Sequence, residues 1–390
     1  FAVPTLRSKA HDDSLTAEKR LSAAVALAAL GENETQVVID KSIEVSADYG
    51  PSILTALRQD SGSVAELRDH FLQVGDAPDV ADKRAVLALL ALNLGERMPA
   101  ERMTLVAGDP TPRTQFIHQF PSWCSDCVQI ANALEQSENA SFRSAVCLGF
   151  GKLATNSATI PVEQRKRLEE VLIKLYQTAP DAATHSAAQF ALRQWGFDTS
   201  GVDLPQGTSA TRNWRVTESR LHLLEVPAGQ LPRQSKDGAR VDVAAFLICS
   251  QEVSRQIYEQ YLTEEGIEGR HESDTRVSPT IRHPANSVSW MGAIRFLNWL
   301  SRKESLEPYY ELSGGMWHIA DRNGTGYRLP TEVEWEYASR AGSQTVYAFG
   351  EDVRYLDDYA TYGSSLHCTP CASKLPNAWG LFDTAGNVWE

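Results

Sequence analysis

Runs of alanine and leucine at helical spacing recur in the first half of the sequence and constrain its fold more than any other feature. The clearest runs cover Leu21–Leu30, Ala85–Leu94 and Ser144–Phe150, and a looser copy covers His185–Leu192. Small apolar residues at three- and four-residue spacing let helices pack closely, and their recurrence is typical of stacked helical repeats. Because the intervals are irregular, an ordinary helical domain is the alternative. Both interpretations predict an all-α domain over residues 1–196.

The composition changes after residue 196. Glycine, proline, serine and threonine are frequent over 197–213, which is typical of a linker. From residue 214 onward, short apolar stretches such as Leu221–Val226 and Val241–Cys249 alternate with turns, a pattern that predicts strands. We therefore expect a second domain over 214–390.

Three helices are predicted within this second half. Ser254 and Ser289 each precede apolar residues at three- and four-residue spacing, so each serine can cap a first turn. Thr331 and Glu334 have the spacing of a capping box, in which each side chain satisfies a free backbone N–H group. A few capped helices between short strands and irregular segments predict an α+β domain.

Charge and hydropathy exclude several classes of protein. The chain has 390 residues, with 37 Lys and Arg against 50 Asp and Glu, and a formal net charge of −13. Hydrophobic residues make up 42% of it, which argues against wholesale disorder. The acidic balance argues against a nucleic-acid partner, and no apolar run reaches the roughly 18–20 residues of a membrane span. We expect a soluble region, either cytoplasmic or the extracytoplasmic part of a membrane-anchored bacterial protein.

Eight motifs follow one another in the second half. They are Glu225–Gly229, Gln251–Ser254, Pro284–Trp290, Phe296–Leu300, Pro308–Leu312, Tyr327–Ala338, Pro376–Asp383 and Gly386–Glu390. In this order the motifs resemble those of the formylglycine-generating enzyme, or sulfatase-modifying factor, family. The resemblance implies a C-type-lectin-like α+β domain that is incomplete at its C-terminal end.

Most of these motif residues also have a structural interpretation. Arg328, Glu334 and Glu336 can form charge-assisted bonds within the domain. Large aromatic side chains can anchor a domain that has little regular structure. The anchors expected in this way are Trp290, Trp299, Trp335, Trp379 and Trp389.

The resemblance also implies a reaction. Enzymes of the family bind one copper(I) ion through two cysteines and use oxygen to convert a cysteine of a substrate protein to formylglycine. Soft thiolates suit copper(I). Those cysteines follow the motif that is Gly386–Glu390 here, where this sequence ends, so its catalytic residues are unknown. Because the sequence also begins at Phe1, we expect a fragment of a longer protein that is itself inactive in this oxidation.

The alternative is a non-catalytic module that binds protein or peptide partners. The helical half looks similar to the HEAT-like repeat region that, in planctomycete-type bacterial proteins, links a serine/threonine kinase to such a domain. The module would then be the sensor part of a kinase. This sequence contains no Gly-rich loop and no His-Arg-Asp or Asp-Phe-Gly motif, so a kinase domain could only precede Phe1.

Calcium is the metal that the resemblance implies for this chain. Family members with calcium sites use carbonyl and side-chain oxygens around the motif that supplies Gly386, Asn387, Val388 and Glu390 here. Hard oxygen ligands on a tight turn suit Ca²⁺. The alternative is that Asn387 and Glu390 only bond to neighbouring loops.

Two cysteine pairs have CxxC spacing. Cys124 and Cys127 mimic a redox motif, but they lie in a stretch predicted to be helical, without the βαβ context of such motifs. Cys368 and Cys371 follow His367 and could form a disulfide or hold zinc, although no fourth ligand is evident. We expect reduced structural thiols in both places.

Overall fold

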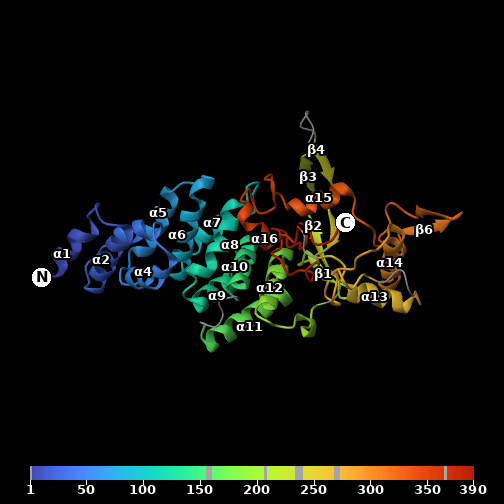
Figure 1. The fold of residues 1–390 in the computed structure, drawn as a ribbon, viewed down its shortest axis with the longest axis horizontal. Coiled ribbons are helices and arrows are strands. Elements are labelled where there is room, and N and C mark those ends of the chain that lie inside the picture. The colour runs from blue at the N-terminus through green and yellow to red at the C-terminus, as the bar shows by residue number, and fades with distance from the viewer. Residues whose placement is uncertain (1, 155–159, 206–208, 233–239, 268–272, 364–366) are drawn as a thin grey trace. The chain divides into compact units, whose positions relative to one another are not determined.

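A computed structural model describes residues 2–154, 160–205, 209–232, 240–267, 273–363 and 367–390 (Figure 1). The chain divides into two compact units. The first consists of Phe1–Tyr176 and Ala187–Ser200, and the second of Gln177–Ser186 and Gly201–Glu390. The second unit therefore takes in a short segment of the expected helical half. Residues 206–208 of the expected linker lie outside the described residues.

The first half of the chain is helical, as the alanine- and leucine-rich runs predicted (Figure 1). Short 3-10 helices, η1 (Ala47–Tyr49), η2 (Pro78–Val80) and η4 (Thr199–Gly201), supplement the α-helices. The α-helices are α1 (Ala2–Ala10), α2 (Ala17–Ala29), α3 (Thr35–Ser42), α4 (Gly50–Leu57), α5 (Ser63–Gln73), α6 (Ala81–Asn93), α7 (Met98–Met103), α8 (Thr111–Trp123), α9 (Cys127–Gln136), α10 (Ala140–Leu153), α11 (Val162–Thr178) and α12 (Ala182–Gln194).

Helices α6 and α10 form the centre of the first unit, and α8 packs against both. Every residue from Arg84 to Asn93 on α6 is buried. On α10, Gly149 faces the Phe120 ring so closely that an added Cβ would lie 2.4 Å from a ring atom. The small residues in the predicted runs thus serve close helix packing.

The described strands of the second unit form three small antiparallel sheets. The expected single strand over Val241–Cys249 is wrong, because the strand is interrupted at Ala244–Ala245 and its two halves pair with different strands. The sheets are β1 (Trp214–Val216) with β2 (His222–Val226) and β5 (Phe246–Cys249), in the order β1-β2-β5; β3 (Gly229–Pro232) with β4 (Arg240–Val243); and β6 (Tyr310–Ser313) with β7 (Met316–Ile319).

The predicted helices of the second unit are present. They are α13 (Arg255–Glu264), α14 (Trp290–Lys303) and α15 (Glu332–Arg340), and the structure adds η5 (Val353–Tyr355) and α16 (Leu356–Tyr359). Ser289 Oγ accepts the N–H group of Gly292 at 3.1 Å, and Thr331 and Glu334 form the predicted capping box. Ser254 occupies the N-cap position of α13, but its side chain forms no capping hydrogen bond.

Trp214 explains why residues 177–186 belong to the second unit. Its indole N–H group donates to the carbonyl of Ala179 at 2.7 Å, and its ring stacks on His185 with 3.7 Å between the centroids. His185 Nε2 lies 2.8 Å from Nδ1 of His222 on β2. The start of α12 is thereby fixed to the first sheet.

Of the five expected aromatic anchors one is buried, two are half-buried and two are exposed. Trp299 is 3% exposed and packs in a cluster with Tyr261 and Phe296, as an anchor should. Trp290 is 56% exposed and Trp389 is fully exposed. The expectation that all five tryptophans serve as core anchors is therefore wrong for Trp290 and Trp389.

Length and apolar character decide whether a helix of the described residues could span a membrane. None of these helices is both long enough and apolar enough to cross a bilayer.

Candidate functional site

The motif Gly386–Glu390 closes a tight connection between loops of the second unit. Gly386 has φ +92°, and an added Cβ there would lie 2.1 Å from the carbonyl oxygen of Thr361, so a side chain cannot be accommodated. Asn387 follows in the left-handed region at φ 72°, and its N–H group donates to the same Thr361 oxygen at 2.8 Å. The backbone therefore requires glycine at position 386 and favours asparagine or glycine at position 387.

The Asn387 side chain bonds to two other loops. Its Oδ1 accepts the N–H group of Thr369 at 2.8 Å, and its Nδ2 donates to the Thr369 carbonyl at 3.2 Å and to Glu252 Oε2 at 2.6 Å. The Val388 N–H group donates to Glu252 Oε1 at 3.2 Å. The motif thus holds the start of the loop after β5 against the Cys368–Cys371 loop.

The predicted calcium ligands do not all have the same freedom to bind a cation. The side-chain oxygen of Asn387 is engaged by the amide of Thr369. The carbonyl oxygens of Gly386 and Val388 and the carboxylate of Glu390 are oxygen donors of the kind Ca²⁺ prefers, although Glu390 also accepts the indole N–H group of Trp335. Calcium at this motif remains a prediction, and three of its four residues fit it better than Asn387 does.

A bidentate ion pair joins the segment before α15 to the first turn of that helix. The guanidinium of Arg328 donates to both carboxylate oxygens of Glu334, at 2.8 and 2.6 Å. Glu334 also accepts the N–H group of Thr331 at 2.8 Å. These bonds, that of Arg328 first, lower the pKa of Glu334 to about 2. The pair confirms the sequence-based expectation that Arg328 and Glu334 form charge-assisted bonds within the domain, and the structure identifies them as each other's partners.

Replacing Glu334 by glutamine should reduce the loss of folding stability that the protein undergoes at low pH. Because the folded pKa lies below the usual value of 4.5, the carboxylate stabilises the fold above about pH 4.5 and loses this contribution as the pH falls towards 2. We expect wild type to lose about 1–2 kcal/mol more than Glu334→Gln between pH 6 and pH 3, after discounting for solvent screening. Urea denaturation at both pH values measures this. Glu332→Gln, an exposed change in the same helical turn, should behave as wild type.

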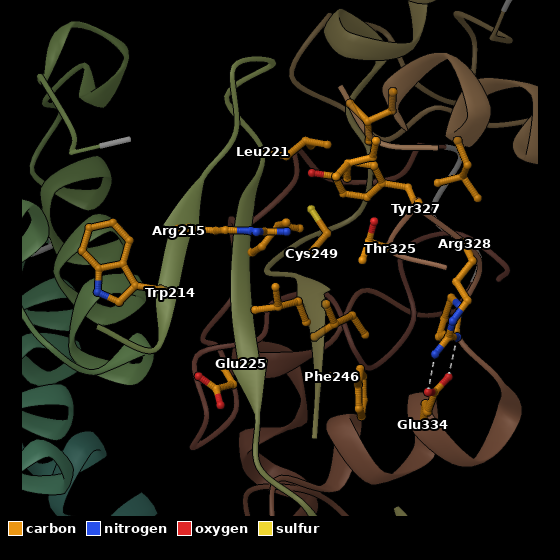
Figure 2. A pocket seen from close by; sticks show the side chains of 18 of the residues that line it. Trp214, Arg215, Leu221, Glu225, Phe246, Cys249, Thr325, Tyr327, Arg328 and Glu334 are labelled. Carbon is orange, nitrogen blue, oxygen red and sulfur yellow. Dashed lines mark hydrogen bonds and ion pairs between the residues drawn. The ribbon is translucent and has the colours of Figure 1, made fainter. Parts of the chain in front are cut away.

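A pocket of about 920 Å³ lies beside this ion pair, between the first sheet, α14 and the segment before α15 (Figure 2). Apolar side chains such as Leu221 and Phe246 form much of its wall. Burial raises the pKa of the Cys249 thiol to about 11 and that of Tyr327 to about 12. Both groups are therefore neutral near pH 7, and Cys249 is not an activated nucleophile.

A second pocket, of about 600 Å³, has aromatic walls, and we call it the aromatic pocket. It is lined by the start of α14, the β6–β7 hairpin and the segment before α15. Trp290 packs edge-on against Tyr310, with 6.2 Å between the centroids, and leaves 56% of its surface exposed. Sequence reasoning missed this pocket because an exposed and a buried tryptophan look alike in one sequence. The lining residues are Trp290, Tyr309, Tyr310, Trp317, His318, Ile319, Arg322, Arg328, Leu329, Pro330 and Thr331.

All six cysteines lie in described residues, and none forms a disulfide. In the first unit, the Sγ atoms of Cys124 and Cys127 are 3.5 Å apart. In the second unit, Cys368 and Cys371 are buried, and the Cys368 thiol donates to the Val277 carbonyl at 3.1 Å. Burial raises the pKa of Cys368. Neither pair lines one of the two pockets.

Comparison with known proteins agrees with the motif order. Residues 210–390 match the model of the sulfatase-modifying factor enzyme 1-like domain. The formylglycine-generating enzyme of Streptomyces coelicolor is 31% identical over 122 residues, which are 28% of this chain and 31% of that enzyme. The serine/threonine-protein kinase pkn1 of Chlamydia caviae is 34% identical over 110 residues, which are 28% of this chain and 13% of the kinase.

A third relative covers more of the chain at lower identity. The chaperone protein LppX of Paenibacillus barcinonensis is 25% identical over 217 residues, which are 47% of this chain and 73% of that protein. This chain spans about a third or less of the length of the first two relatives. One of these relatives is named as a formylglycine-generating enzyme and the other as a protein kinase. What the matches share is the second half of this chain: residues 210–390 are a domain of the sulfatase-modifying factor enzyme 1-like family.

Proposed function

We propose that the domain over residues 210–390 is a recognition module whose aromatic pocket binds an extended, proline-containing protein segment. The observation that supports this most is the exposure of Trp290 beside Tyr310 and Trp317 at a pocket of about 600 Å³. Aromatic-lined grooves receive proline-rich segments because the proline ring packs flat on an aromatic face and costs little conformational entropy.

The charges at this pocket favour an acidic residue in the bound segment. Arg322 is exposed at the pocket, and Arg328 is already paired with Glu334. A carboxylate of the ligand can therefore pair with Arg322, which would add specificity more than affinity. The ligand class is thus a peptide with proline next to aspartate or glutamate.

Finer assignments of the fold belong to the same proposal. A HEAT-like stack in the helical half would offer a further surface to protein partners, and a C-type-lectin-like arrangement of the second unit would present its loops for binding. The similarity to kinase pkn1 makes a sensor role beside a kinase domain one setting for such a module.

Trp290→Ala should weaken peptide binding at least about tenfold, because exposed aromatic residues at the centre of an interface carry much of the binding energy. Fluorescence anisotropy with labelled peptides that contain Pro-Glu or Pro-Asp measures this. Tyr362→Ala removes an exposed aromatic residue outside both pockets and should leave the affinity unchanged. Failure of all such peptides to bind, or equal affinity of Trp290→Ala and wild type, would refute the proposal.

Oxidation of a substrate-protein cysteine to formylglycine is the second candidate, favoured by the 31% identity with the Streptomyces enzyme. Bound copper(I) would supply oxygen activation in that reaction. The cysteines of this domain do not fit an open copper site: Cys368 and Cys371 are buried, Cys249 is half-buried, and Cys368 donates to a main-chain carbonyl. We therefore expect no aldehyde when this chain is incubated with copper(I), oxygen and a cysteine peptide of the sulfatase type. Aldehyde detected by hydrazide labelling would support the oxidase instead.

A further inference from the structure

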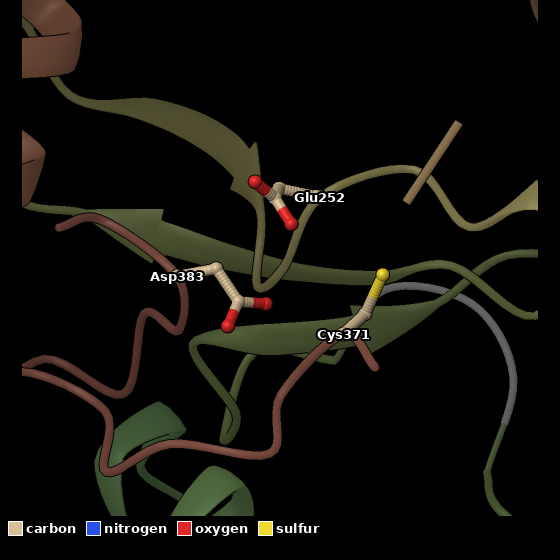
Figure 3. A group of neighbouring side chains, drawn as sticks. All are labelled: Glu252, Cys371 and Asp383. Atoms are coloured by element: carbon tan, nitrogen blue, oxygen red, sulfur yellow. The ribbon is translucent and has the colours of Figure 1, made fainter. Parts of the chain in front are cut away.

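Side chains of three loop segments converge near the end of β5 in the second unit. Glu252 follows β5, Cys371 belongs to the loop after α16, and Asp383 ends the Pro376–Asp383 motif (Figure 3). One potential ligand atom from each residue lies within 4.8 Å of the other two. Cys371 and Asp383 are buried at 6% and 4% exposure. The structure thus brings together a thiol and two carboxylates that are up to 131 positions apart in the numbering.

We propose that Glu252, Cys371 and Asp383 bind a zinc ion. Zinc accepts thiolate and carboxylate ligands together, with bonds of about 2.0–2.3 Å, in tetrahedral geometry. Such bonds place neighbouring ligand atoms roughly 3.3–3.8 Å apart, so small side-chain movements would close the observed cluster around the ion. The fourth position is left to water or a ligand.

The chemistry of the donors selects zinc among common metal ions. Calcium and magnesium take oxygen ligands and avoid thiolates, whereas copper(I) prefers thiolates and avoids carboxylates. A mixed set with one sulfur and two oxygens matches a borderline-soft ion such as Zn²⁺. This site is therefore chemically distinct from the predicted calcium motif, although Asn387 bonds to Glu252 and connects the two.

Hydrogen bonds from the Gly386–Glu390 motif hold the carboxylate of Glu252 in place. The main-chain and amide donors Val388 N and Asn387 Nδ2 orient the carboxylate, as outer-shell partners of metal ligands do.

Cys368 has a different role from Cys371, despite their CxxC spacing. Its thiol donates to the carbonyl of Val277 and lies 3.1 Å from Ser278 Oγ. We therefore assign Cys368 to the support of the loop and not to the metal. This distinguishes the proposed site from a simple CxxC zinc clip, in which both cysteines would be required.

Titration of the metal-free protein with Co²⁺, followed by displacement with Zn²⁺, tests the site. The full chain carrying Cys124→Ser and Cys127→Ser is the background, because it removes the thiol pair of the first unit. We expect one Co²⁺ per chain with a thiolate-to-cobalt charge-transfer band, displaced by Zn²⁺ and not by Ca²⁺. Cys371→Ser should abolish the band, and Glu252→Gln and Asp383→Asn should each weaken binding at least about tenfold.

Cys368→Ser and Cys249→Ser are the matched controls and should keep the affinity of the background protein. Absence of the band in the background protein, or its survival in Cys371→Ser, would overturn the proposal. So would a loss in Cys368→Ser while Glu252→Gln binds normally, which is the pattern of a CxxC clip. Circular dichroism of each variant shows whether it is folded, and the background protein provides the decisive measurement if a variant is not.

Discussion

Asn93→Ala is expected to lower the free energy of unfolding of the first unit by about 3–4 kcal/mol. Asn93 is 1% exposed at the end of α6, and its amide forms four hydrogen bonds. Nδ2 donates to the carbonyls of Leu89 and Trp123, at 2.7 and 2.9 Å. Oδ1 accepts two successive N–H groups in the Cys124–Cys127 loop, both at 3.0 Å. Alanine leaves these partners unsatisfied in or near the core, which costs more than the net value of the bonds.

Urea denaturation followed by far-ultraviolet circular dichroism measures this loss, since the first unit is helical. Asn132→Ala is the matched control, because Asn132 is only partly buried on α9 and accepts one long bond of 3.3 Å from Arg167. We expect the control to change stability by less than about 0.5–1 kcal/mol. A comparable loss in both variants would contradict a special role of Asn93.

Asn387→Ala should destabilise the second unit by about 3 kcal/mol through two separate effects. It removes the hydrogen bonds to Thr369 and to the half-buried carboxylate of Glu252. It also places alanine at φ 72°, which asparagine tolerates better. Thermal unfolding in the presence of a metal chelator measures the sum without any contribution from bound metal.

Asn387→Gly separates the two effects, because glycine accepts positive φ but supplies no amide. We expect it to recover about 1 kcal/mol relative to alanine. Hydrogen exchange at the Thr369 amide should be faster than wild type in both variants, since both lose its acceptor. Unchanged protection of that amide would show that Asn387 does not hold the loop.

The two asparagines have one role in common. Each uses a side-chain amide to fix a CxxC loop that lies far from it in sequence, at Cys124–Cys127 in the first unit and at Cys368–Cys371 in the second. A side-chain amide has both a donor and an acceptor, so it can satisfy loop N–H groups and carbonyls that the main chain leaves over. The positions of both thiol pairs therefore depend on residues outside the CxxC motifs.

Local sequence patterns predicted several features of the structure correctly. The helical first half follows from runs of small apolar residues, and the capping box follows from Thr331 and Glu334, which are three positions apart. The family of the second half follows from the order of its motifs, which residues 210–390 match as a domain. These features depend on neighbours in the chain or on order along it, so they can be recognised without three-dimensional contacts.

Residues whose role depends on distant partners were not predictable in this way. Trp290 and Trp299 lie nine positions apart on one helix, yet one is exposed at a pocket and the other is buried. The strand expected over Val241–Cys249 is divided because its halves pair with different strands. In each case burial or pairing is set by segments that fold against the residue from elsewhere.

By itself, the sequence determined the helical character of the first half, the capped helices of the second and the family of the domain, because all of these are encoded in local spacing and motif order. Only the tertiary structure decided that Glu252 meets Cys371 and Asp383, and that Asn387 bonds to a residue 135 positions away. Loop contacts of this kind have no sequence period. They form only when burial of the surrounding apolar side chains brings the loops together.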